Sequence, residues 1–175
     1  MRITYHVAAS EDGFIAAENG DITWLEDADI DVAETGLVEF MTRIDGMVMG
    51  RRTYDFIVDY GSWPYGVTPA WVCTTTEIVR LDGAILTTAK SVGEVLRQST
   101  EQGLRDMWLV GGGELASSFL DQNLITDISV TQLPIRLGQG IPLFSRHRLT
   151  DLTSQSEIRT NKPGFQLIEM QLAQH

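Results

Sequence analysis

Three consecutive glycines, Gly111–Gly113, stand where the chain could hold a phosphate group. The four apolar residues before them, Met107–Val110, are typical of a short buried strand, and Glu114–Asp121 after them has apolar residues at helical spacing. A strand, a glycine turn and a helix together point unpaired backbone N–H groups at an anion. Glycine suits such a turn because it tolerates positive φ and lets a ligand approach the backbone. An ordinary strand-to-helix turn that uses glycine for tight packing explains the pattern equally well.

A second candidate anion site is Gly50–Thr53, which directly follows the apolar run Gly46–Met49. Arg51, Arg52 and Thr53 would open a helix. The guanidinium groups and the positive end of the helix dipole would then attract the same phosphate. The alternative is a solvated basic turn, although two adjacent arginines stand out in so acidic a chain.

A third polar stretch, Thr74–Thr76, ends the predicted strand Ala70–Thr74. Its hydroxyls could serve a nucleotide or simply cap the turn. All three candidate sites therefore follow the carboxyl end of a strand, which is where ligands bind in parallel α/β sheets. This coincidence predicts a dinucleotide cleft.

The remaining elements are expected to position these three sites. Further strands are predicted at Ile3–Ala9, Phe14–Ala17, Ala84–Thr87 and Asp127–Pro134, helices at Glu34–Ile44, Gly50–Val58, Ser91–Gln102 and Glu114–Asp121, and an antiparallel hairpin at Thr153–Thr160 and Phe165–Leu172. Strands and helices alternate as far as Phe119, and strands alone follow. We therefore predict a three-layer α/β fold with a mostly parallel central sheet of about eight strands, four helices and an antiparallel C-terminal hairpin. A single domain over residues 1–175 is expected.

The composition argues against several classes of partner. The chain has 13 basic and 24 acidic residues and a net charge of −11, so nucleic acids and anionic membranes are not expected to bind. The single cysteine, Cys73, stands in an apolar run typical of a buried thiol, and no cluster of histidines and cysteines suggests a metal site. Neither a signal peptide nor an apolar run long enough to span a bilayer is evident, so we expect a cytoplasmic protein.

Several motifs, taken together in their order along the chain, resemble one protein superfamily. Val48–Tyr54, Leu109–Leu115 and Ile128–Leu133 resemble motifs of the dihydrofolate reductase superfamily. Ser10–Ala16 and Leu137–Phe144 are more similar to one branch of it, the C-terminal reductase domain of the bifunctional riboflavin-biosynthesis deaminase/reductase and its stand-alone relatives. The resemblance runs over nearly the whole chain, and the paired arginines and the triple glycine are specific in combination.

The resemblance implies that the cofactor is NADPH. The residues at the cofactor positions would be Gly50, Arg51, Arg52, Thr53, Thr75, Val110, Gly111, Gly112, Gly113, Glu114 and Leu115. Arg51, Arg52 and Thr53 would hold phosphates, Thr75 would lie near the adenosine end, and Gly111–Leu115 would cradle the pyrophosphate and approach the nicotinamide. The arginines beside Thr74–Thr76 would also offer charge for the 2′-phosphate that NADH lacks. The superfamily further implies a cis peptide bond between Gly111 and Gly112.

For the substrate, the resemblance implies that Trp24 belongs to a mobile flap and that Ile57 and Thr131 contact the bound molecule. The catalytic carboxylate would be Glu34, as in the folate enzymes, or Asp12, as in the riboflavin branch, and the proton could also come from water. The residues by themselves allow other interpretations. Trp24 fits a buried side chain that pins a surface loop, Glu34 fits a helix N-terminus, and Asp12 fits an Asp-Gly turn.

These expectations predict an NADPH-dependent reductase of a small heterocyclic or carbonyl substrate, resembling the 5-amino-6-(5-phosphoribosylamino)uracil reductase of riboflavin biosynthesis. Dihydrofolate reductase itself is a second interpretation, weakened because Trp63–Pro69 has no basic residue for the glutamate tail of folate. A nucleotide-binding protein without turnover is a third, supported by the absence of a convincing general acid. The resemblance also implies a homodimer that associates through the late strands, where Phe165, Leu167 and Ile168 need cover.

Overall fold

The computed structural model describes residues 1–173, so the last two residues of the predicted domain lie outside the described range. The strands are β1 (Arg2–Ser10), β2 (Phe14–Ala16), β3 (Gly46–Gly50), β4 (Ala70–Cys73), β5 (Leu86–Ala89), β6 (Asp106–Gly111), β7 (Asp127–Leu133), β8 (Ile141–Pro142), β9 (Ser154–Lys162) and β10 (Phe165–Leu172). The α-helices are α1 (Thr23–Glu26), α2 (Leu37–Arg43), α3 (Arg51–Tyr60), α4 (Val92–Glu101) and α5 (Gly113–Leu120), and two 3₁₀-helices are η1 (Val32–Thr35) and η2 (Leu149–Asp151).

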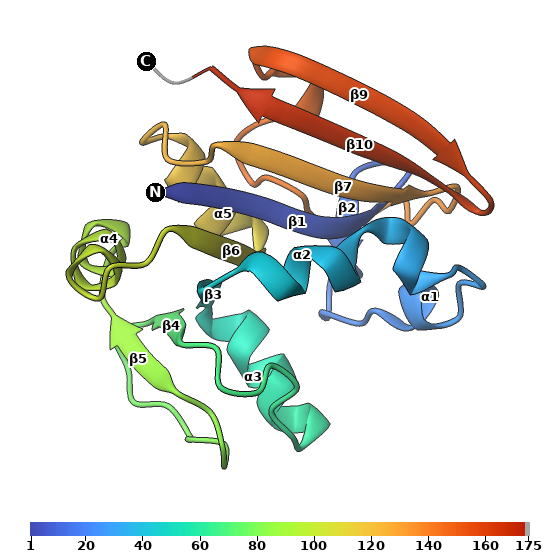
Figure 1. Cartoon of the computed structure of the whole chain (residues 1–175). Helices are drawn as coiled ribbons and strands as arrows, with labels where there is room; N and C mark the ends of the chain where they lie inside the picture. Colours follow the sequence, from blue (N-terminus) through green and yellow to red (C-terminus); the bar gives the residue numbers. More distant parts are fainter. Residues whose placement is uncertain (174–175) are drawn as a thin grey trace.

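Eight of the strands form one sheet in the order β5-β4-β3-β6-β1-β7-β10-β9 (Figure 1). The strands from β5 to β7 run parallel to their neighbours, and β10 and β9 pair in the antiparallel sense. The carboxyl ends of β3, β4 and β5 therefore lie side by side at one edge of the sheet. The predicted mostly parallel sheet with an antiparallel C-terminal hairpin is confirmed.

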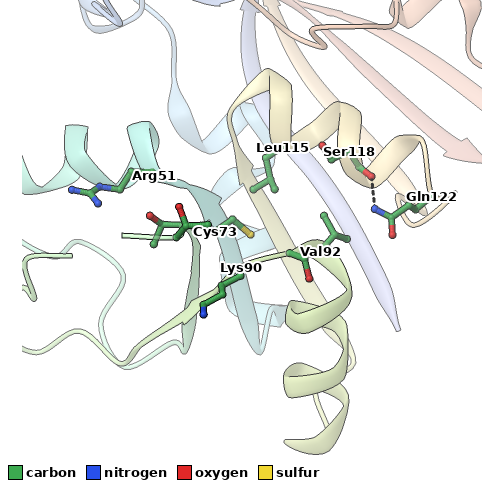
Figure 2. Close-up of a pocket in the computed structure, with 10 residues that line it drawn as sticks. Arg51, Cys73, Lys90, Val92, Leu115, Ser118 and Gln122 are labelled. Atoms are coloured by element: carbon green, nitrogen blue, oxygen red, sulfur yellow. Dashed lines mark hydrogen bonds between the residues drawn. The ribbon is translucent and has the colours of Figure 1, made fainter. Parts of the chain in front are cut away.

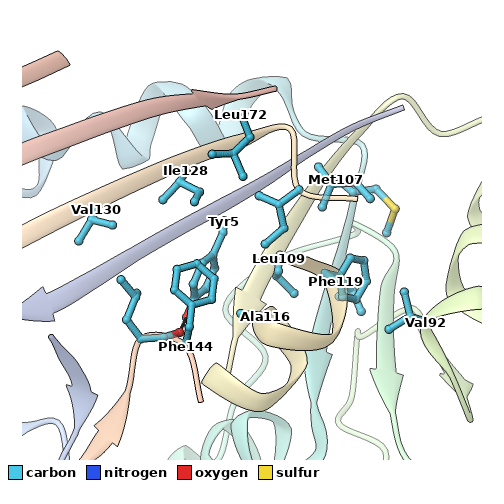
Figure 3. Packing of buried hydrophobic residues seen from close by; sticks show 14 of the residues in the cluster. Tyr5, Val92, Met107, Leu109, Ala116, Phe119, Ile128, Val130, Phe144 and Leu172 are labelled. Carbon is cyan, nitrogen blue, oxygen red and sulfur yellow. Dashed lines mark hydrogen bonds between the residues drawn. The ribbon is translucent and has the colours of Figure 1, made fainter. Parts of the chain in front are cut away.

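Helices cover both faces of this sheet. Successive side chains of a strand point to opposite faces, so the apolar residues of the buried strands pack against helices on both sides. Val48 of β3 packs in a cluster with residues of α4 and α5, whereas its neighbours Met47 and Met49 pack in a second cluster with residues of α2 and α3. Figure 3 shows the first cluster, in which Phe119 of α5 lies beneath the central strands. The predicted three-layer architecture is confirmed.

Two predicted boundaries are wrong. The helix expected at Glu34–Ile44 is the α-helix α2, which begins at Leu37 because Gly36 has a φ of 75° and separates it from the 3₁₀-helix η1. The strand expected at Ala84–Thr87 is β5, two residues later. A turn that ends with the hydrogen bond from Ala84 N to Leu81 O delays its start.

The predicted count of elements is also incomplete. The residues expected as the strand Phe14–Ala17 form β2, which pairs with the two-residue strand β8 in a small sheet of its own. A fifth α-helix, α1, carries Trp24 where the sequence suggested only a loop. Helices and strands do not alternate throughout, because no helix of the described chain connects β4 to β5.

The composition-based expectations concern Cys73, membranes and metals. Burial, together with the nearby Glu94 carboxylate, raises the pKa of the half-buried Cys73 thiol to about 11, so this thiol stays protonated at neutral pH. None of the helices within residues 1–173 has the length and apolar character needed to cross a bilayer. In the same range, no three His, Cys, Asp or Glu side chains gather as metal ligands would.

Candidate nucleotide-binding site

Two helix N-termini meet at the centre of the candidate site. The N-cap residues of α3 and α5 are Gly50 and Gly112, and neither has a side chain that could bond the first N–H groups of its helix. A Cβ placed on Gly50 would lie 3.8 Å from both Gly111 O and Gly112 N, so the two helices begin next to each other. Uncapped N–H groups and the positive ends of two helix dipoles favour an anion at this point.

The three glycines between β6 and α5, Gly111–Gly113, have different structural roles. The peptide bond between Gly111 and Gly112 is cis, as predicted, and Gly111 has a φ of 147°. A Cβ on Gly112 would lie at ordinary contact distances, 3.8 Å from Thr53 Oγ1 and 4.0 Å from Ile15 Cδ1, so this position is not closed by tight packing. A Cβ on Gly113 would lie 2.1 Å from Pro142 O. Gly113 therefore serves tight packing, as the second interpretation of the glycine run has it, whereas the binding of a phosphate at Gly111 and Gly112 stays a prediction.

The two adjacent arginines have separate environments. Arg51 Nε donates to both carboxylate oxygens of Asp55, at 2.7 and 2.9 Å, and Arg51 Nη1 donates to Thr76 Oγ1 at 2.6 Å and to Glu77 O at 2.9 Å. Figure 2 shows its guanidinium group pointing away from α5. Arg52 is exposed, and its side chain has no ion pair or hydrogen bond with another residue in the described range. Arg51 thus positions the threonine loop, and Arg52 keeps its charge available for a ligand.

Two adjoining clefts open where β3, β4 and β5 end. The first, of about 570 Å³, is lined by Arg51, Cys73, Thr74, Thr75, Lys90, Ser91, Val92, Leu115, Ser118 and Gln122 (Figure 2). The second, of about 460 Å³, is lined by Thr74, Thr75, Thr76, Glu77, Ile78, Arg80, Thr88, Lys90 and Glu94. Thr74, Thr75 and Lys90 belong to both, so the clefts form one continuous surface. Volumes in this range are typical of small-ligand pockets.

Several of these lining residues were missed by the sequence analysis. Arg51, Thr75 and Leu115 were predicted, whereas Lys90, Ser118 and Gln122 were not. Ser118 and Gln122 lie one helical turn apart, and Gln122 Nε2 donates to Ser118 O at 3.0 Å. Their i,i+4 spacing is a detectable signal, but only the packing of α5 on the sheet shows which face they occupy.

The N-terminus of α4, in contrast to those of α3 and α5, is capped by its own residues. Ser91 Oγ accepts a hydrogen bond from Glu94 N at 3.2 Å, and Glu94 Oε2 accepts one from Lys90 N at 2.7 Å. Glu94 Oε1 also accepts a hydrogen bond from Gln98 Nε2. The Oε1 atom of the same Gln98 accepts one from the indole Nε1 of Trp71. Ser91 and Glu94 thus cap the start of α4 and fix the backbone of Lys90 at the end of β5.

The two predicted catalytic carboxylates lie apart and outside the two clefts. Asp12 accepts hydrogen bonds from Ser10 Oγ at 2.7 Å, from Leu137 N at 3.2 Å and from Gly138 N at 2.8 Å. Burial raises its pKa, but the hydrogen bonds from the Ser10 hydroxyl and the backbone outweigh this effect and lower the pKa overall. Asp12 thus joins two loops. Glu34 is exposed, and its Oε2 lies 3.7 Å from Lys162 Nζ. Catalysis by either carboxylate stays a prediction.

The three predicted substrate residues also lie outside the two clefts. Ile57 of α3 and Thr131 of β7 are buried on the α2 and α3 side of the sheet, since Val130 beside Thr131 belongs to the opposite cluster. The indole Nε1 of Trp24 is buried and has no hydrogen-bond partner among the described residues. Contacts of these three residues with a substrate stay predictions.

Comparison with known proteins agrees with this arrangement, which is that of the dihydrofolate reductase-like fold. The family model of the RibD C-terminal domain matches residues 1–167, and the chain belongs to this family. The chain is 30% identical to the uncharacterised protein YwjB of Bacillus subtilis (strain 168) over 149 residues, which are 85% of this chain and 84% of YwjB.

Two solved structures are similar to this one. A Shewanella sp. PV-4 protein described as a riboflavin biosynthesis protein has a TM-score of 0.78 at 28% identity, over 99% of both chains. A Thermotoga maritima diaminohydroxyphosphoribosylaminopyrimidine deaminase/5-amino-6-(5-phosphoribosylamino)uracil reductase has a TM-score of 0.74 at 18% identity, over 98% of this chain and 56% of that one. The second similarity concerns the fold alone.

Proposed function

We propose that this protein is an NADPH-dependent reductase of a small heterocyclic or carbonyl substrate, with chemistry related to the reductase step of riboflavin biosynthesis. The observation that carries this proposal is the meeting of the uncapped N-termini of α3 and α5 beside the two clefts. Membership of the RibD C-terminal domain family supports the reductase chemistry.

The residues around the helix N-termini suit a dinucleotide. The N–H groups at the starts of α3 and α5, the Thr53 hydroxyl and the Arg52 guanidinium offer donors to a pyrophosphate, and the absence of a side chain at Gly112 would let it approach the backbone. The clefts beyond them, lined by threonines and Lys90, would receive the adenosine end. When bound, NADPH supplies a hydride. The chain then has to hold and orient both reactants and exclude water.

Water is the best candidate for the proton donor. Asp12 is surrounded by donors that lower the pKa of its carboxyl group, so it is ionised at neutral pH. Glu34 is exposed, lies 3.7 Å from Lys162 Nζ and lines neither cleft. Neither residue lies in the apolar surroundings that are typical of a catalytic acid. Asp12 would instead hold the loop beside β2 in position.

The test is a screen of NADPH oxidation at 340 nm against ribosylaminopyrimidines, dihydrofolate and simple carbonyl compounds. The expected result is oxidation with a ribosylaminopyrimidine or a carbonyl compound, and none with dihydrofolate. Turnover of dihydrofolate would favour the folate interpretation. Saturable binding of NADPH with no oxidation by any acceptor would favour a nucleotide-binding protein without turnover.

A further inference from the structure

The segment that follows β2 begins beside the glycine turn and outside the two clefts. Ile15 Cδ1 of β2 lies 4.0 Å from the position that a Cβ would take on Gly112. No residue from Ile15 to Glu39 lines either cleft. Figure 1 shows α1, which belongs to this segment, and α4 on opposite sides of the molecule. A substrate that meets a cofactor held at the glycine turn therefore has the segment after β2 as a neighbour.

This segment is strongly acidic. Residues 17–39 include eight carboxylates and no lysine, arginine or histidine. The eight are Glu18, Asp21, Glu26, Asp27, Asp29, Asp31, Glu34 and Glu39. Glu26, Asp27 and Asp29 are exposed, and their side chains have no partner in the described range. The negative charge of this segment is therefore largely uncompensated by the segment itself.

Two cations from other elements lie near this acidic side, and both are paired. Arg136, in the loop after β7, has its Nε 3.3 Å from Glu11 Oε2. Lys162, at the end of β9, has its Nζ 3.7 Å from Glu34 Oε2. Neither ammonium nor guanidinium group is thus free of a carboxylate, as a cation that binds a phosphate group would be.

The other cations of the chain lie elsewhere. Arg43 ends α2 just before β3 begins, so it lies at the amino-terminal end of the parallel strands, where it covers the Phe40 ring. Four cations surround the proposed cofactor site: Arg51, Arg52, Arg80 and Lys90. The remainder lie on α4, at the amino-terminal ends of β1 and β6, after β8 or on β9, and are Arg97, Arg2, Arg105, Arg146, Arg148 and Arg159.

We infer that the substrate of this protein carries no phosphate or other anionic group. This inference rests on the proposed reductase function and deepens it by naming the charge of the substrate. Unpaired carboxylates repel an anion that approaches the glycine turn from this side, whereas a neutral or cationic molecule avoids this cost. The Thermotoga maritima protein is named for a phosphoribosyl compound, so the two proteins would differ in this group.

The experiment compares kcat/KM for matched acceptors at saturating NADPH. One pair is 5-amino-6-ribosylaminouracil and its 5′-phosphate, and the other is benzaldehyde and 4-carboxybenzaldehyde. The neutral member of a pair that is turned over should be preferred by about 10-fold or more, which is within the range of electrostatic effects on association. Raising the ionic strength from about 0.01 to about 0.1 M should increase kcat/KM for the anionic member, because the Debye length falls from about 30 to about 10 Å. The neutral member should not respond.

A pair of double variants locates the effect. Glu26→Gln with Asp27→Asn should raise kcat/KM for the anionic acceptor at low ionic strength and leave the neutral acceptor unchanged. Asp59→Asn with Asp82→Asn is the control, because it removes the same charge from exposed residues at the end of α3 and before β5, and it should change neither. Equal urea midpoints show that the variants are folded.

The outcomes separate this inference from the proposed function. Turnover of the 5′-phosphate at least as fast as that of the nucleoside, or a kcat/KM for an anionic acceptor that falls with salt, would overturn the inference alone. The same holds if both double variants act alike. A wild type that oxidises NADPH with no acceptor of either pair or of the wider screen would overturn the proposed reductase function, and the inference with it.

Discussion

The hydroxyl oxygen of Thr53 lies 3.8 Å from the position that a Cβ would take on Gly112. Thr53 belongs to the first turn of α3, and Gly112 is the N-cap residue of α5. The starts of two helices from different parts of the chain therefore lie next to each other. A side chain added to Gly112 would extend toward Thr53 at this point.

Replacing Gly112 by Val should abolish NADPH binding without unfolding the protein, because its nearest neighbours lie at ordinary contact distances. Gly113→Ala is the matched comparison. Its methyl group would meet Pro142 O, so this variant should lose about 1–3 kcal/mol of unfolding free energy. Urea denaturation and NADPH titration of both variants check the prediction. A stable Gly113→Ala variant, or a Gly112→Val variant that still binds NADPH, would contradict the separate roles.

Replacing Arg52 by Ala should weaken NADPH and NADH by the same factor, since the exposed guanidinium is placed to serve the shared pyrophosphate. A charge-assisted hydrogen bond makes a loss of about 10-fold reasonable. Arg97→Ala is the control, because Arg97 pairs with Glu101 on the exposed face of α4. Titration with both dinucleotides gives the ratio. A loss confined to NADPH would instead assign the 2′-phosphate to Arg52.

His6 should make stability depend on pH. It is buried and stacks on Phe40, with ring centroids 4.8 Å apart, and burial together with Arg43 lowers its pKa from 6.5 to about 4. Between these values the unfolded chain binds a proton that the folded chain does not, so stability falls as the pH drops from about 6.5 to about 4. The loss should reach about 3 kcal/mol.

The variant His6→Phe isolates this effect, because phenylalanine fits an aromatic environment and does not titrate. Urea denaturation at pH 7 and pH 4.5 gives the unfolding free energy of both proteins. The wild type should lose more stability than the variant over this interval, whereas the carboxylates contribute to both alike. Parallel losses would show that His6 is protonated in the folded protein.

We propose that the protein forms a dimer through β9. This strand pairs only with β10 in the described chain, most of its residues are exposed, and Ile158 on it is 58% exposed. Unpaired, apolar sheet edges favour association. Sedimentation velocity at micromolar concentration should show a dimer, and Ile158→Glu should shift it toward the monomer. A monomeric wild type would refute this proposal.

The sequence was sufficient to predict the features that depend on local pattern. The glycine run, the arginines at a helix start and the alternation of strands and helices predicted an anion site at the strand ends, and the structure has α3 and α5 beginning there. The hydrogen bonds of the Arg51 side chain could not be predicted, because one of its partners is Thr76, 25 residues away in the sequence. Lys90 gave no signal either, since only the pairing of β4 with β5 brings it beside Thr75.

Calorimetric titration of the wild-type protein with NADPH measures the proposed cofactor binding itself and needs no knowledge of the substrate. Because the N–H groups at the starts of α3 and α5 are proposed to hold the pyrophosphate, we expect saturable binding of one NADPH per chain, lost in Gly112→Val. No binding by the folded wild type at millimolar NADPH would contradict it.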